Sequence, residues 1–197
     1  NYQGMSYVVL DRNMGATRNN RGTGDEWKES VGVYYQWGRK DPLAIFLHSS
    51  SDSPMTIEQT IRENTRYIYE NNWDVIGNCQ LWGNTKTIYD PCPLGYKVMP
   101  QIAWSGFTTT GSNSNRFDEF NIVGGWDNGF NFKCDPSGSI TAWYPGTSWG
   151  HWAIGNPDTN HGWCWSSTKP SNEETPRYFE IRYDDEFNTH VGVNWGY

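Results

Sequence analysis

The sequence is short of aliphatic residues and has no long apolar segment. Leu, Ile, Val and Phe together account for 33 of the 197 residues, and the longest uninterrupted apolar run is residues 43–47. A run of that length is far too short to cross a bilayer, so we expect no membrane contact by this domain. An N-terminal segment with the features of a signal peptide is also missing. We therefore interpret residues 1–197 as one mature or excised domain.

Basic residues are few and scattered. The chain has 15 Lys and Arg against 22 Asp and Glu, which gives a formal net charge of −7, and its basic residues form no run. Nucleic-acid binding needs a surface of Lys and Arg that contacts phosphates, so we exclude nucleic acid as a partner. The same charge balance disfavours a role at a membrane surface.

Cysteine is scarce, and its spacing matches no zinc module. The four residues are Cys79, Cys92, Cys134 and Cys164. None of them forms a Cys-x-x-Cys pair, so we expect no metal bound by thiolates. Their even number is compatible with an oxidising compartment outside the cytoplasm, where up to two disulfides form. Three connectivities are possible, and the sequence does not choose among them.

Aromatic residues and glycine are what the sequence has in quantity. Its 12 Trp and 12 Tyr supply large rings that bury much area and keep a polar group, which suits a small core and also a binding surface. Its 21 Gly and 10 Pro are spread along the chain. Such spacing predicts many sharp turns between short elements and argues against long helices.

The clearest strand is predicted at residues 177–183. Its alternation sets Phe179, Ile181 and Tyr183 on one face, which we expect in the core. The residues of the opposite face, which we expect to meet solvent or ligand, are Tyr178, Glu180 and Arg182.

The other predicted elements are short. Strands are predicted at residues 6–11, 86–89 and 95–98. Thr56 and Gln59 have the spacing of a capping box, which predicts a short helix there, and a second helix of two turns is predicted at residues 100–107. Residues 19–29 are polar and contain glycine, so we expect a surface loop. Together these elements predict an α+β fold with two short helices, small antiparallel sheets and long loops.

Four segments carry a resemblance to a known family. They are residues 9–17 (VLDRNMGAT), 35–42 (YQWGRKDP), 86–96 (KTIYDPCPLGY) and 165–167 (WSS). As an ordered set over nearly the whole chain, they resemble the C-type-lectin-like C-terminal domains of gut-bacterial surface lipoproteins and fimbrillin-like pilus-tip proteins. The resemblance implies a C-type-lectin-like fold, an extracellular place on the cell surface or at a pilus tip, and adhesion or ligand binding.

Some members of this family are similar to the variable proteins of diversity-generating retroelements, in which surface positions near the carboxyl end are targets of mutation. The resemblance therefore implies a hypervariable binding face near the end of this chain. The positions it places there are Trp163, Tyr178, Glu180, Arg182, Asp185, Asn188, His190 and Trp195.

A cluster of aromatic residues between positions 143 and 165 adds two candidates. Flat rings beside amide and carboxylate groups suit sugar or peptide surfaces, because the rings bury apolar faces and the polar neighbours fix orientation. We expect Trp149, Trp152 and Trp163 on the binding surface and Trp165 in the core.

Patterns for metal or catalytic chemistry are weak. The lectin calcium motifs Glu-Pro-Asn and Trp-Asn-Asp do not occur, and we interpret residues 155–158 and 184–186 as a turn and a solvated loop. Thiol chemistry of the formylglycine-generating class needs a reactive pair near the carboxyl end, where only Cys164 lies. No histidine has a recognised nucleophile context, and no Gly-x-Ser-x-Gly occurs. We predict no catalytic residue, no cofactor and no metal.

The sequence as a whole predicts an adhesive module that binds a host or bacterial glycan or protein through an aromatic, loop-built face. One alternative is a structural domain of a pilus or surface protein, which packs against pilus subunits through the rest of its parent chain. The other is an enzyme like the formylglycine-generating class. An exposed aromatic face favours binding, whereas a deep pocket with a converging acid, base or thiol set favours catalysis.

Overall fold

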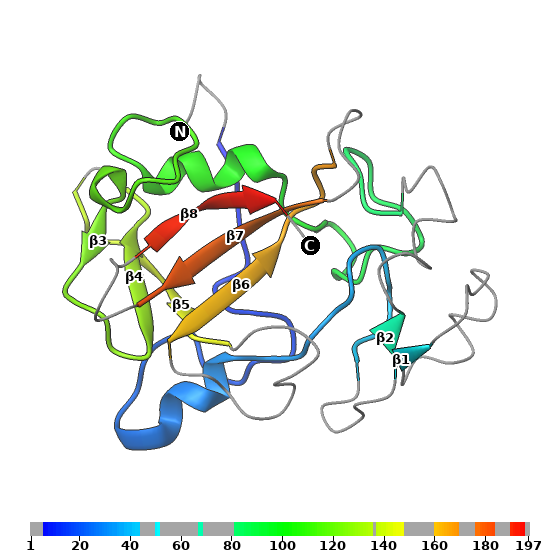
Figure 1. Cartoon of the computed structure of the whole chain (residues 1–197), viewed down its shortest axis with the longest axis horizontal. Helices are drawn as coiled ribbons and strands as arrows, with labels where there is room; N and C mark the ends of the chain where they lie inside the picture. Colours follow the sequence, from blue (N-terminus) through cyan, green and yellow to red (C-terminus); the bar gives the residue numbers. More distant parts are fainter. Residues whose placement is uncertain are drawn as a thin grey trace.

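The structure contains two antiparallel sheets of three strands each, one toward one end of the molecule and one in its middle (Figure 1). The computed structural model describes residues 6–43, 50–51, 67–68, 81–135, 137–147, 160–169, 176–183 and 190–195. The first sheet joins β3 (Ile122–Val123), β4 (Gly129–Lys133) and β5 (Thr141–Pro145). The second sheet joins β6 (His161–Trp165), β7 (Arg177–Arg182) and β8 (His190–Trp195).

β7 is the central strand of the second sheet, and it confirms the strand predicted at residues 177–183. Along β7 the register pairs Phe179 with Cys164 of β6 and Ile181 with Gly162 of β6. Both Phe179 and Ile181 are almost fully buried, as their alternation predicts.

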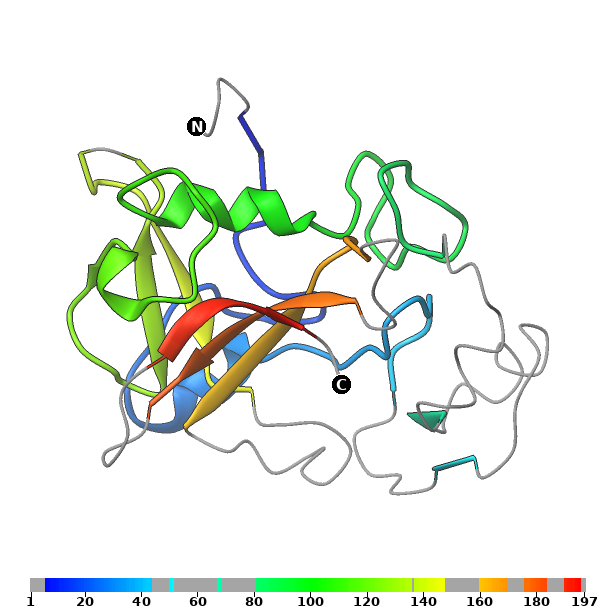
Figure 2. The same cartoon turned by 45° about the horizontal axis from the view of Figure 1, so that its top comes forward.

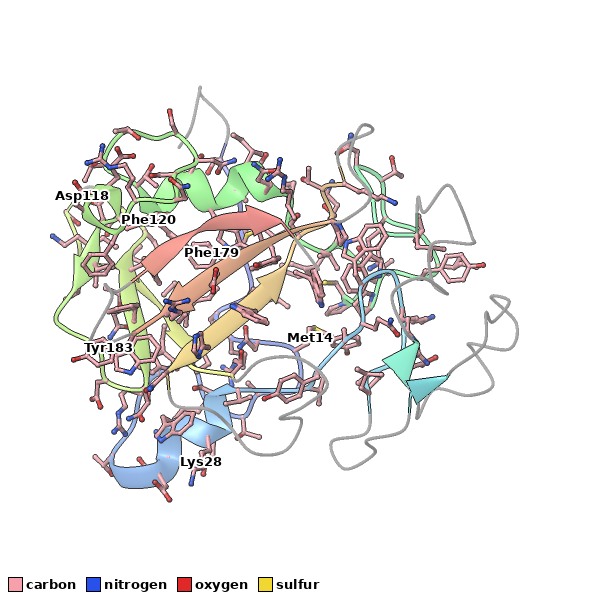
Figure 3. All side chains as sticks on the ribbon, viewed as in Figure 1. Met14, Lys28, Asp118, Phe120, Phe179 and Tyr183 are labelled. Atoms are coloured by element: carbon pink, nitrogen blue, oxygen red, sulfur yellow. The ribbon has the colours of Figure 1, made fainter. Side chains whose placement is uncertain are left out.

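An aromatic core lies against the Phe179 side of β7. Its buried residues are Trp104, Phe107, Phe120, Phe130, Phe132, Phe179 and Ile181. The rings of Trp104 and Phe179 stack with their centroids 5.2 Å apart, and those of Phe120 and Phe179 are 6.0 Å apart (both Phe residues are labelled in Figure 3). Rings thus take the packing role that aliphatic residues have in most cores.

The helices are short 3-10 helices. The predicted helix at residues 100–107 is confirmed as η3 (Gln101–Phe107), which packs against β7 and lies along the second sheet in Figure 2. Within residues 19–29, which we expected to form a loop, η1 (Gly24–Ser30) begins. Thr23 and Glu26 form a reciprocal capping box there, and this local signal accounts for the difference. A single turn, η4 (Phe117–Glu119), precedes β3.

Three predicted strands are wrong. Residues 6–11 form no strand, and residues 86–89 and 95–98 lie in turns and irregular chain. In the last two segments, turns and hydrogen bonds to the Asp90 carboxylate take the place of a backbone ladder. The helix predicted near Thr56 lies outside the described residues.

A parallel pair, β1 (Ser50–Ser51) and β2 (Tyr67–Ile68), stands at the opposite end of the molecule from β3–β5 in both views (Figures 1 and 2). The fold is therefore α+β with small, mainly antiparallel sheets, as the sequence predicts. In the part of the chain that the structure describes, no helix combines the length and the apolar character needed to cross a bilayer.

Candidate functional site

A cavity of about 740 Å³ lies beside the free edge of β6, and we call it the aromatic cavity. Its walls come from residues 7–14, 33–36, 95–100, 142–144 and 163–165, together with Trp104 and Tyr178. Cavities of this size are typical of ligand sites in proteins. Met14, one of the lining residues, is labelled in Figure 3.

The aromatic cavity reaches from the surface to the core. Val8 in its wall is 83% exposed, whereas Trp104 is only 1% exposed. Tyr7 and Tyr96 are also exposed lining residues. The cavity therefore has an open mouth near the amino-terminal segment and a floor formed by the aromatic core.

Two of the tryptophans that line the cavity, Trp143 and Trp165, have their indole N–H groups bonded within the protein. Trp165 donates its Nε1–H to the Tyr35 carbonyl oxygen at 3.0 Å, and Trp143 donates its own to Ser30 Oγ at 2.9 Å. Each N–H is therefore already satisfied within the protein. What remains available to a ligand from these two side chains is their apolar ring surface.

Two thiols line the aromatic cavity, and both stay protonated near neutral pH. Burial raises the pKa of Cys164 to about 12. Burial, followed by the nearby Asp90 carboxylate, raises the pKa of Cys92 to about 12. Because the thiolate is the nucleophile and the metal ligand, these cysteines are poor candidates for thiol chemistry. Cys92, Cys134 and Cys164 form no disulfide in the structure.

Two of the sequence-predicted site residues meet at the aromatic cavity. Trp163 of β6 and Tyr178 of β7 both line it, with ring centroids 5.5 Å apart. Trp165, which we expected in the core, is half-buried, lines the same cavity and contacts Tyr178 edge-on at 6.0 Å. The three rings form one continuous patch of cavity wall.

The second face of β7 is less open than its alternation suggested. Tyr178 and Glu180 are 7% and 9% exposed, so this part of the strand is not the solvent-facing surface that we expected. The physical reason for Tyr178 is cross-strand packing, because Trp163 and Trp165 lie against its ring. Arg182 is half-buried and is not among the residues that line the aromatic cavity.

Backbone pairing separates two more of the predicted residues. His190 lies opposite Arg182 in the register, so these two share a position on the sheet. Trp195 lies opposite Arg177, in the alternate set that includes Phe179. The backbone register therefore does not pair Trp195 with Tyr178, whose partner on β8 is Asn194. Trp149, Trp152, Asp185 and Asn188 lie outside the described residues.

Sequence reasoning missed most of the cavity wall. Residues 7–14 and 95–100, Trp104 and Trp143 contribute to it from segments far apart in the chain. No local pattern reports such a convergence. The one usable signal was that residues 7–10 are apolar and strand-prone, which marked them as a segment that needs a partner.

Metal-binding geometry does not appear in the described segments, where no group of three His, Cys, Asp or Glu side chains is placed to hold an ion. Residues 155–158 and 184–186, considered above for calcium, fall outside those segments.

The fold and the cavity define the chain as a small α+β domain with an aromatic cavity that opens at its surface. Comparison with known proteins adds no family: no family model, no curated protein and no solved structure matches the chain.

Proposed function

We propose that this chain is an extracellular adhesive domain with a C-type-lectin-like fold, displayed on a cell surface or at a pilus tip. It binds a glycan or protein ligand at the aromatic cavity and the strands beside it, and it is a binding module rather than an enzyme. The observation that carries the proposal is a surface-open cavity walled by the rings of Trp143, Trp163, Trp165 and Tyr178.

The chemistry of the cavity supports binding over catalysis. Its aromatic walls provide apolar contact area, and rings of this kind dominate the energetics of recognition sites. Cys92 and Cys164, the two lining thiols, have pKa values raised to about 12 and are therefore neutral. A formylglycine-generating type of reaction requires a readily formed thiolate, which this environment disfavours.

The packing of the family-like segments supports the C-type-lectin-like part of the proposal. Trp37, Tyr89 and Trp165 come from three of those segments and meet in one hydrophobic cluster. Trp37 also donates its Nε1–H to the Ser166 carbonyl oxygen at 2.8 Å. Three of the four segments that resemble the family are thus in contact with one another.

The test is a glycan and host-protein array probed with the intact chain and two variants. Trp163→Ala removes a ring from the cavity wall, and we expect at least about tenfold weaker binding, because truncating an aromatic hot spot costs about 2 kcal/mol or more. Trp126→Ala is the matched control: Trp126 is also half-buried but lies outside the cavity, stacked on Tyr183.

Equal binding by the parent chain and Trp163→Ala would show that the ligand does not bind at the aromatic cavity. If the parent chain binds nothing on the array and instead associates only with other subunits of its assembly, the structural alternative replaces the adhesive one. Circular dichroism of both variants checks that neither result comes from unfolding.

A further inference from the structure

We infer that the aromatic cavity binds an extended apolar peptide, which pairs with the outer edge of β6 at Trp165 and with the outer edge of β5 at Trp143. The inference rests on the proposed function only in taking the cavity as the binding site. It adds the chemical class of the ligand and the way in which it is held.

Hydrogen bonding to β7 uses only one edge of β6. Ser166 donates its backbone N–H to the Arg177 carbonyl oxygen just beyond one end of β6. Tyr183 donates its N–H to the Asn160 carbonyl oxygen just beyond the other. The even-numbered residues of β6 therefore face β7, because backbone groups alternate between the two edges of an antiparallel strand.

The odd-numbered residues of β6 direct their backbone groups to the opposite edge. Near its start this edge is occupied by Thr147, which donates its N–H to the His161 carbonyl oxygen at 2.6 Å. Thr147 Oγ1 accepts the N–H of Trp163 at 3.1 Å. Further along, Trp165 reaches the part of the edge that lines the aromatic cavity.

β5 likewise has one edge that pairs with a neighbouring strand, β4, and an opposite edge that pairs with no strand in the described part of the chain. Gly146 donates its N–H to the Asn128 carbonyl oxygen, and Cys134 donates its N–H to the Ile140 carbonyl oxygen. The even-numbered residues of β5 therefore pair with β4, and the backbone of Trp143 is directed away from that ladder. Trp143 also lines the aromatic cavity.

The backbone N–H and C=O groups of Trp143 and Trp165 on these edges have no hydrogen-bond partner within the described residues. Trp143 is a buried residue and Trp165 is half-buried. An occupant that supplies a backbone donor and acceptor to each of these residues is therefore favoured over a hydrocarbon. An extended peptide supplies donors and acceptors at the spacing of a strand.

The walls and the size of the cavity define the side chains and length of the peptide. The indole N–H groups of Trp143 and Trp165 already donate hydrogen bonds within the protein. Their rings therefore offer a ligand only apolar surface, which favours apolar side chains over sugar hydroxyls. A packed strand residue occupies about 160 Å³, from its rise of about 3.3 Å and spacings of about 4.8 Å and 10 Å to its neighbours. The volume of about 740 Å³ then holds about four or five residues.

The test uses the intact chain and a synthetic acetylated and amidated peptide, Lys-Val-Thr-Val-Thr-Val-Lys. We expect saturable binding in a titration followed by NMR, with slower hydrogen exchange of the Trp143 or Trp165 amide protons. Two further peptides carry N-methyl groups on alternate residues, one set for each edge. We expect at least one of them to bind about tenfold or more weakly, because each lost backbone hydrogen bond lowers affinity.

Ala142→Phe places a ring in the cavity from β5, and we expect it to weaken peptide binding at least tenfold. The matched control is Ile140→Phe, since Ile140 is exposed, precedes β5 and does not line the cavity. The NMR spectrum of each variant reports whether it is folded. If Ala142→Phe does not fold, the two N-methylated peptides still decide the question with the unaltered protein.

The inference fails if both N-methylated peptides bind as tightly as their parent, or if saturating peptide leaves both amide protons unchanged. It also fails if 1-decanol occupies the cavity and the peptide does not, because the site is then a hydrocarbon site. An array ligand that Trp163→Ala weakens, combined with no peptide binding, overturns this inference and leaves the proposed function standing.

Discussion

One buried carboxylate, that of Asp90, organises the turn that leads into the cavity wall. Its side chain is 1% exposed and pairs with Lys86 Nζ at 3.0 Å. It also accepts the backbone N–H groups of Cys92 and Val98, each at 2.9 Å. Cys92 and Val98 both line the aromatic cavity, so this single residue fixes the path of one of its walls.

Replacing Asp90 with Asn therefore tests how much the buried carboxylate and its hydrogen bonds stabilise this region. We expect Asp90→Asn to lower the free energy of unfolding by about 3 kcal/mol, because it leaves Lys86 without its charge partner and backbone donors poorly satisfied. Urea denaturation measures the change. Asp118→Asn, which removes an exposed carboxylate paired with Arg116 at 2.9 Å, is the control and should leave stability nearly unchanged. Equal effects of the two substitutions would show that burial of Asp90 is unimportant.

Among single residues, the sequence predicts burial better than exposure. Phe179 and Ile181 are buried as their alternation requires, and Trp163, which the resemblance places on a binding face, lines the aromatic cavity. Tyr178 was expected on an open face and is buried instead. The alternation correctly sets Tyr178 on the face opposite Phe179. The residues that cover Tyr178 belong to β6, however, and the sequence of β7 alone does not predict them.

At the scale of elements, β5 and β6 approach each other closely where β5 ends and β6 begins. A Cβ atom added at Gly162 of β6 would collide with the Pro145 carbonyl oxygen of β5. It would also lie 2.9 Å from Ile181 Cγ1 in the core. Only glycine lets these two strands meet at this point.

We expect Gly162→Ala to lower the free energy of unfolding by about 2 kcal/mol, as overpacking of a well-packed position typically does. Gly125→Ala is the control, because a Cβ atom there meets nothing within 4 Å. Thermal and urea denaturation of the two variants measure the difference. A Gly162→Ala protein as stable as Gly125→Ala would contradict the close packing of β5 and β6.

The elements differ in how much of each could be predicted. β7 and η3 were predicted because their signals are local. The signal for β7 is alternation, and the signal for η3 is Pro100 followed by Ala103, Trp104 and Phe107 at helical spacing. η1 was missed although the spacing of Thr23 and Glu26 is also a local signal. The absence of a strand at residues 6–11 could not be foreseen, because pairing depends on which edge lies nearby in the fold.

At the scale of the whole molecule, composition predicts the kind of core but not its cavity. A chain poor in aliphatic residues and rich in rings must pack those rings, and the core built from Trp104, Phe132 and Phe179 follows from that. The aromatic cavity depends instead on how segments 7–14, 95–100 and 142–144 converge. Contacts between such distant segments leave no periodic signal in one sequence.

Hydrogen–deuterium exchange of the chain, alone and saturated with its tightest array ligand, tests the central claim most directly. A ligand held in the aromatic cavity should slow exchange in residues 142–144 and 163–165, which form its walls, and leave β3 and η4 unchanged. Protection confined to β3, η4 or η1, with no change in residues 142–144 and 163–165, would contradict the account.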